Sequence, residues 1–137
     1  MKYTLILCFF LCLLLNATAQ LKKFEILYVE NVEFVNKKMI SKGQDEKLTK
    51  LKGFIINDLN SNKTLTLING KDSIKYKSVI TPKLIDENEE ASITDYYLVD
   101  KNKSECILRV TYSKVTKLMM FSFVRGSKAK NYLTKPL

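Results

Sequence analysis

The sequence has 137 residues, of which 46% are hydrophobic and 27% charged, and its 23 basic and 14 acidic side chains give a formal net charge of +9. This length fits one domain, and the apolar content excludes a disordered polyelectrolyte. The chain contains no histidine, which removes the most common general base and the imidazole ligand of many metal sites.

The first segment has the three parts of a secretory signal peptide in the expected order. Lys2 supplies a positive start, residues 5–15 form an unbroken apolar run, and residues 17–19 read Ala-Thr-Ala, an A-x-A cleavage pattern. As a helix the apolar run would span about 16 Å, which is too short for roughly 30 Å of hydrocarbon. We therefore expect residues 1–19 to be a cleaved signal peptide and residues 20–137 to form a single secreted or periplasmic β-rich domain.

The positions of the cysteines limit the disulfides that the mature chain can form. Cys8 and Cys12 fall inside the predicted signal peptide, so Cys106 is the one cysteine expected after cleavage. No intramolecular disulfide is then available even in an exported protein, and the fold must depend on its apolar core. No second apolar run of transmembrane length follows the first.

Alternation of apolar and polar residues predicts short β-strands along most of the chain. Residues 24–29 alternate in this way, and although a helix over 24–36 would also satisfy the spacing, the β-branched and aromatic content favours a strand. We interpret residues 41–47 as a loop or the start of a short helical turn. Residues 53–57 predict another strand.

The clearest local signal is Asn69-Gly70, which lies between the alternating runs 63–68 and 73–80. Asn and Gly both tolerate positive φ, so this pair predicts a β-hairpin with Asn69-Gly70 at its tip. Pro82 should end the second strand because proline has no amide hydrogen to donate to a sheet. The acidic stretch 86–90 that follows is interpreted as a solvated loop.

The second half of the chain continues the pattern of short strands. Three are predicted over residues 93–99, 105–112 and 118–124, and a terminal strand is expected near residues 132–133. The total of seven to nine strands predicts an all-β fold. We expect an antiparallel meander that forms a small lipocalin-like barrel or a β-sandwich.

The sequence offers no catalytic constellation. Without histidine no Ser–His or Cys–His pair is available, and Cys106 alternates in phase with Leu108 and Val110, which predicts a small apolar filler on the core face. We therefore expect a protein that is not an enzyme. The alternative is a small secreted hydrolase that uses paired carboxylates near residues 86–95. Its candidate acids are Asp86, Glu87, Glu89, Glu90 and Asp95.

Residues 118–124 are apolar at nearly every position. Either both faces of this strand are buried, or one face lines a cavity, because a small barrel can enclose one apolar ligand. Met119, Phe121 and Phe123 share one face and are the residues predicted to line such a ligand cavity.

The last third of the chain is strongly basic, since residues 101–137 hold nine basic residues and one acidic residue. Basic side chains interleaved with aromatic ones are typical of polyanion-binding surfaces, whereas lysine-rich edges also keep strands from pairing with other chains. Because we expect export, an anionic polysaccharide or lipid headgroup is the expected partner rather than nucleic acid. The predicted polyanion contacts are Lys114, Lys117, Arg125, Lys128 and Lys130.

Two turn segments come close to a calcium-loop pattern. Residues 58–62 and 100–104 carry oxygen side chains at alternate positions, but both lack the glycine and the final glutamate of that pattern. We interpret them as turns and expect no metal and no cofactor. Asn62 and Asn102 also begin N-x-S/T sequons, which matter only in a eukaryotic secretory pathway.

The stretch from Asp95 to Thr111 combines an acid-Lys-x-Lys turn with a strand that holds a single cysteine. Together with the Ala-x-Ala-Gln cleavage region and the Lys- and Asn-rich composition, it resembles small secreted single-domain β-proteins of Bacteroidetes-type bacteria. The resemblance covers residues 60–125 and implies a compact exported β-protein without transferable site residues. The function we expect is a non-catalytic binding module for a small apolar ligand or an anionic envelope polymer.

Overall fold

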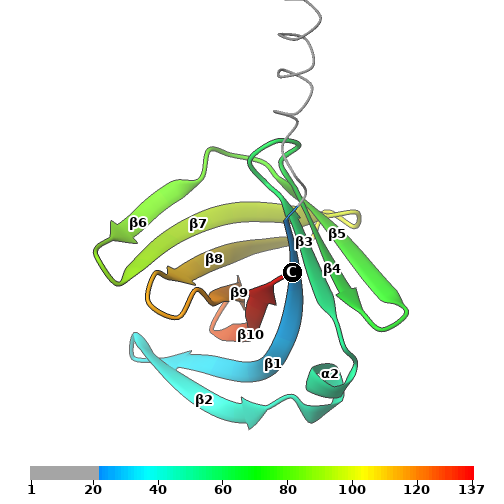
Figure 1. Cartoon of the computed structure of the whole chain (residues 1–137), viewed down its shortest axis with the longest axis horizontal. Helices are drawn as coiled ribbons and strands as arrows, with labels where there is room; N and C mark the ends of the chain where they lie inside the picture. Colours follow the sequence, from blue (N-terminus) through cyan, green and yellow to red (C-terminus); the bar gives the residue numbers. More distant parts are fainter. Residues whose placement is uncertain (1–21) are drawn as a thin grey trace, which may run out of the picture.

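The structure is a computed structural model that describes residues 22–137 (Figure 1). The predicted signal peptide and its cleavage site lie outside the described residues. Over residues 22–137 there are ten strands and one short helix. They are β1 (Lys22–Val35), β2 (Lys38–Gln44), α2 (Glu46–Lys50), β3 (Phe54–Asp58), β4 (Thr64–Asn69), β5 (Asp72–Ser78), β6 (Lys83–Glu87), β7 (Ala91–Asp100), β8 (Glu105–Ser113), β9 (Met119–Arg125) and β10 (Lys128–Pro136).

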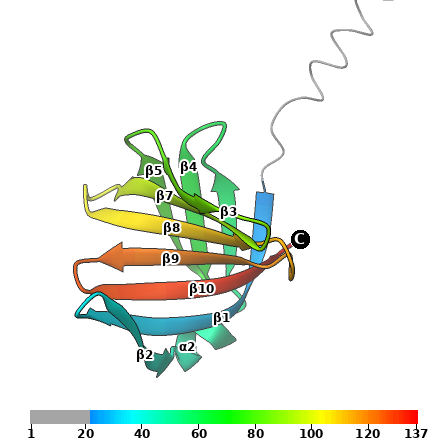
Figure 2. The same cartoon turned by 90° about the vertical axis from the view of Figure 1, so that its left-hand side faces the viewer.

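Eight antiparallel strands close into a barrel in the order β1, β3, β4, β5, β7, β8, β9 and β10, and β10 pairs back onto β1. β2 pairs with β1 and β6 pairs with β7 outside this ring. Figure 2 shows β7, β8, β9, β10 and β1 side by side, with β3, β4 and β5 crossing behind them. The all-β prediction is confirmed, and the fold is the small lipocalin-like barrel.

The long strand β1 joins the two sides of the barrel. Its first residues pair with β3, its last residues pair with β2, and β10 runs along it between Phe24 and Glu33. The register with β10 shifts between Ile26 and Tyr28, and a bulge of this kind bends a strand. Residues 24–36, for which a helix was the alternative, are therefore a strand up to Val35, and a turn begins at Asn36.

The hairpin predicted around Asn69-Gly70 is present, but its tip is shifted by one residue. Asn69 pairs in register with Asp72 as the last residue of β4, so the two loop residues are Gly70 and Lys71. Gly70 has a φ of +62°. Positive φ at the first loop residue alone is the requirement of a type II′ turn, which glycine meets without steric cost. Because of this shift, Asn69 is a residue of β4 and not a residue of the turn.

Two segments expected to be loops contain strands. Residues 38–44 form β2, followed by α2, and residues 83–87 form β6, so Asp86 and Glu87 are strand residues. Every residue of β2 and of β6 is exposed. For residues 41–44 and 86–87 the expectation of a loop was wrong, because an edge strand with no buried face does not alternate between apolar and polar residues. The short helical turn that was the alternative for residues 41–47 is present as α2, which begins at Glu46.

Inward-facing side chains from both sides of the barrel form one core. Phe24 and Phe121 meet edge to face with ring centroids 5.3 Å apart, and Phe121 is fully buried. Such pairs prefer this geometry because the ring edge is positive and the ring face negative. The core consists of Phe24, Ile26, Val29, Ile55, Leu59, Leu65, Leu67, Tyr76, Leu98, Cys106, Leu108, Val110, Phe121, Phe123 and Tyr132.

Cys106 is a buried free thiol on the inner face of β8, as its alternation predicted. It pairs across the sheet with Leu98. Burial raises the pKa of the thiol because a thiolate loses hydration in the core.

Candidate functional site

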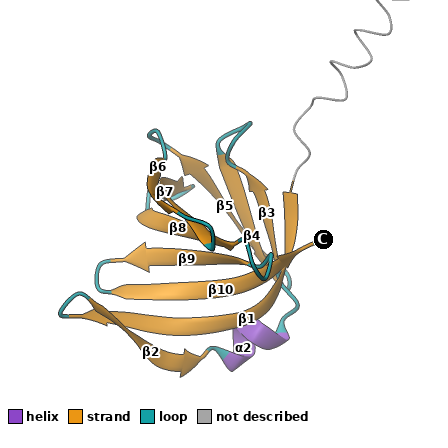
Figure 3. Ribbon diagram, turned by 60° about the vertical axis from the view of Figure 1, so that its left-hand side comes forward, coloured by secondary structure: helices purple, strands orange, loops and turns teal. Residues whose placement is uncertain are grey.

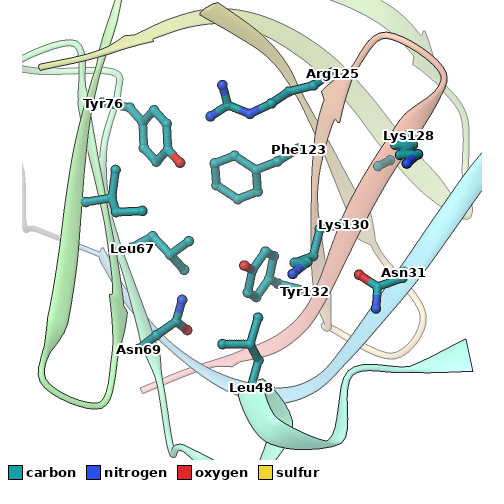
Figure 4. A pocket seen from close by; sticks show the side chains of 12 residues that line it. Asn31, Leu48, Leu67, Asn69, Tyr76, Phe123, Arg125, Lys128, Lys130 and Tyr132 are labelled. Carbon is teal, nitrogen blue, oxygen red and sulfur yellow. The ribbon is translucent and has the colours of Figure 1, made fainter. Parts of the chain in front are cut away.

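The barrel is only partly filled. A cavity of about 440 Å³ lies between the β4–β5 hairpin, α2 and the β9–β10 hairpin (Figure 4). This volume is within the range of small-molecule sites, about 300–1,000 Å³. The cavity is lined by Asn31, Leu48, Leu67, Asn69, Ile74, Tyr76, Phe123, Arg125, Lys128, Ala129, Lys130 and Tyr132.

Three aromatic rings form a continuous wall of this cavity. Phe123 lies between Tyr76 and Tyr132, with ring centroids 5.3 Å and 5.5 Å away respectively. Burial raises the pKa of Tyr76, and it raises the pKa of Tyr132 to about 12 because a phenolate there would lose its hydration. Both hydroxyl groups are therefore neutral at physiological pH. Each tyrosine side chain presents an apolar ring with a polar end to the cavity.

The rim of the cavity is cationic. Arg125, Lys128 and Lys130 belong to the β9–β10 hairpin and all contribute to the lining, which contains no Asp or Glu. Arg125 and Lys128 flank the two-residue turn, where they pair across the hairpin. A low-dielectric wall beside these charges strengthens their attraction for an anion.

Lys130 is already neutralised by the acid that caps α2. Its Nζ lies 3.1 Å from Oδ2 of Asp45. Asp45 also caps α2, since its Oδ1 accepts from the Leu48 amide at 3.1 Å. The pKa of Asp45 is lowered by that backbone hydrogen bond and, secondarily, by Lys130. Figure 3 shows α2 beside the β1–β2 end of the barrel, where this ion pair fixes it.

Arg125 has only neutral hydrogen-bond partners among residues 22–137. Its Nη1 donates to Oγ of Ser104 at 2.5 Å and to the Glu105 carbonyl at 3.3 Å. The nearby Asp100 carboxylate accepts from the Asn102 and Ser104 amides within its own turn. In Figure 4 the guanidinium reaches from β9 across the mouth toward Tyr76.

Asn69 lines the same cavity, and its side-chain oxygen is packed toward Gly53. Its Oδ1 is buried and has no hydrogen-bond partner within residues 22–137. An unpaired buried acceptor costs free energy, about 1–3 kcal/mol. Asn69 belongs to this wall because it is a strand residue, which the sequence-based placement at the hairpin tip had missed.

The three residues predicted to line a cavity have different positions. Phe123 lines it, Phe121 lies deeper and is fully buried in the core, and Met119 packs half-buried against the core near the other end of β9. Residues on one face of β9 therefore belong partly to the core and partly to the cavity wall, because the barrel is filled at one end and open at the other.

The five predicted polyanion contacts do not form one surface. Arg125, Lys128 and Lys130 flank the β9–β10 turn, whereas Lys114 and Lys117 lie in the β8–β9 connection at the opposite end of β9. Lys114 is paired with Glu87 at 3.3 Å. The basic residues near the mouth thus belong to the cavity rather than to an extended basic face.

The candidate acids of a hydrolase lie outside the barrel cavity. Asp95 forms a two-bonded ion pair with Arg109 on the neighbouring strand, with both N–O distances 2.8 Å. Asp86, Glu87, Glu89 and Glu90 are exposed residues of β6 and the β6–β7 turn. None of these five residues contributes to the cavity lining.

The two calcium-like segments form hydrogen-bonded turns. Asp58 Oδ2 accepts from the Asn62 side chain, and Asp100 Oδ1 accepts from two backbone amides of its turn. Lys103 within the second segment and Lys63 directly after the first have positive φ. These contacts are the ones by which Asp and Asn stabilise turns.

Comparisons of the chain with protein-family models, with curated proteins and with solved structures found no match. The functional argument therefore depends on the cavity and on the chemistry of its lining.

Proposed function

We propose that this protein is a non-catalytic binding module, secreted or periplasmic, that holds a small apolar ligand in the open end of its barrel. The observation that carries the proposal is the 440 Å³ cavity with the aromatic wall Tyr76–Phe123–Tyr132. A ligand that fills this space removes apolar surface from water, which is worth about 25 cal/mol per Å² before association costs.

The position of the charged residues favours a cavity ligand over an envelope polymer. A polymer needs a continuous basic surface, but Lys117 and Arg125 lie at opposite ends of β9. The alternative, a hydrolase, needs two carboxylates facing a shared cleft, and Asp95 is instead neutralised by Arg109 outside the cavity.

Titration with N-phenyl-1-naphthylamine, a neutral fluorophore that emits strongly in apolar surroundings, tests the proposal. We expect saturable binding at one site per chain. Ile74 lines the cavity and is 41% exposed, so Ile74→Trp narrows the cavity without disturbing the buried core. This variant should bind the fluorophore about tenfold more weakly, which corresponds to about 1.4 kcal/mol.

Leu84→Trp is the matched control. Leu84 is 56% exposed on β6 and does not line the cavity, but it belongs to an exposed apolar segment that could attract the dye. We expect wild-type affinity for this control. Equal affinities for the wild type and Ile74→Trp, or no saturable binding, would reject cavity binding.

A further inference from the structure

We propose that the cavity ligand is an amphiphilic carboxylic acid, with its carboxylate bound by Arg125 at the mouth and its apolar part against Phe123 and Leu67. This inference rests on the proposed function and specifies its ligand class. It joins two independent features of one site, namely an apolar interior and a cationic rim on which Arg125 has no carboxylate partner within residues 22–137.

Arg125 is the cation best suited to bind the headgroup. Lys130 is already paired with Asp45, whereas Arg125 donates only to neutral oxygens of Ser104 and Glu105. Both of these bonds use Nη1, which leaves the other edge of the guanidinium available to a ligand. A planar guanidinium binds a carboxylate through two parallel hydrogen bonds, which an ammonium group cannot do.

The surroundings of Arg125 hold it in place for this role. Its two bonds tie one nitrogen of the exposed guanidinium to the start of β8, which reduces the side-chain freedom that is lost on binding. Tyr76 lies opposite it across the mouth, and its burial-raised pKa keeps its hydroxyl protonated and able to donate. The headgroup site is therefore arranged before the ligand arrives.

The interior selects for an apolar remainder. Below the mouth the lining includes the side chains of Leu48, Leu67, Phe123 and Tyr132. A second charged group there would lose its hydration without a counterion, which is strongly unfavourable. A molecule with one anionic end and one apolar body matches this polarity, whereas a polyanion does not.

Calorimetric titration with dodecanoate and with 1-dodecanol, both below their aggregation concentrations, tests the inference. The two probes share the same chain and differ at the headgroup. We expect the wild type to bind dodecanoate about tenfold more tightly than dodecanol. Arg125→Gln should remove this preference, with dodecanoate losing more affinity than dodecanol.

Two control variants separate the contact from the overall charge. Lys117→Gln makes the same change in net charge at the opposite end of β9 and should keep the tenfold preference. Lys128→Gln should reduce the preference less than Arg125→Gln does. If Lys128→Gln alone abolishes the preference, the assignment to Arg125 is wrong.

The remaining outcomes distinguish this inference from the proposed function. If dodecanol and N-phenyl-1-naphthylamine bind but dodecanoate binds no more tightly, the acid is rejected and the apolar site stands. If the preference survives in Arg125→Gln, the headgroup site is rejected. If none of the three probes binds, both proposals fail.

Discussion

Lys130 on β10 and Asp45 at the start of α2 form an ion pair at 3.1 Å across 85 residues of sequence. The contact holds the short helix against the barrel, where Val29 also bonds to it through Thr49 Oγ1 at 3.0 Å. Because Leu48 of α2 lines the cavity, the pair also fixes one wall of the site.

We expect Asp45→Asn to lower the free energy of unfolding at neutral pH by up to about 1 kcal/mol, because asparagine retains the cap but loses the ion pair. The pKa of Asp45 is lowered in the folded state, so its contribution is present above the ordinary value of 3.8 and disappears as pH falls through the lowered value. Urea denaturation of both proteins between neutral and acidic pH should show the two stabilities converge.

Glu46→Gln is the control for this effect. Glu46 forms an exposed pair with Lys50 on the same helix at 3.8 Å. Exposed pairs of this kind contribute little, so we expect a change below about 0.5 kcal/mol. A constant difference between Asp45→Asn and the wild type at every pH would contradict the role of the Asp45 charge.

Tyr132 should make the protein sensitive to alkali. Burial raises the pKa of Tyr132 to about 12 from an ordinary 10.0. Between these two values the unfolded chain loses this proton while the folded chain retains it, so stability falls as pH rises. Relative to Tyr132→Phe, the wild type should lose on the order of 2 kcal/mol over this window. Parallel stability curves for the two proteins would show that Tyr132 titrates normally.

Gly53 is required by a close backbone approach. A Cβ built on it would lie 2.6 Å from the Ile68 carbonyl oxygen and 2.8 Å from Cδ1 of Ile26. We expect Gly53→Ala to destabilise the fold by about 1–3 kcal/mol, since the rigid carbonyl cannot move aside. The comparison is Gly43→Ala, where the space is open and only the φ of +98° is unfavourable. Thermal unfolding should show a larger loss for Gly53→Ala than for Gly43→Ala.

Cys106 should react slowly with a thiol reagent in the native protein. Only 6% of its surface is exposed, and burial raises the pKa of its thiol, so little thiolate is available. Peptide mapping after labelling should find Cys106 modified rapidly in denaturant and slowly without it. Rapid native labelling would place Cys106 outside the core.

The sequence predicts the barrel well where strands have one buried face. β8 alternates between buried and more exposed residues, and β7, β8 and β9 are all found close to their predicted ranges. β2 and β6 lie outside the ring of the barrel and all their residues are exposed. Their sequences therefore lack the alternation of apolar and polar residues that identifies a strand with one buried face.

The residues that line the cavity were harder to predict, because a residue on the inner face lines the cavity only if it lies toward the open end of the barrel. Phe121 and Phe123 share one face of β9, and nothing in their spacing tells which lies in the filled end and which in the open end. Arg125 and Lys117 are close in sequence, but a full strand separates them in space. The Asn69-Gly70 pair predicted the turn. Asn69 lines the cavity because it is the last residue of β4 and precedes the turn by one residue.

The most direct test of ligand binding in the barrel is a map of amide chemical shifts in the isotopically labelled protein during titration with dodecanoate. We predict that the largest changes occur at Tyr76, Phe123 and Arg125, with small changes at Leu84 on β6 and at Lys117 at the far end. Changes concentrated at Leu84 or spread evenly over the surface, or none at the three cavity residues, would contradict the account.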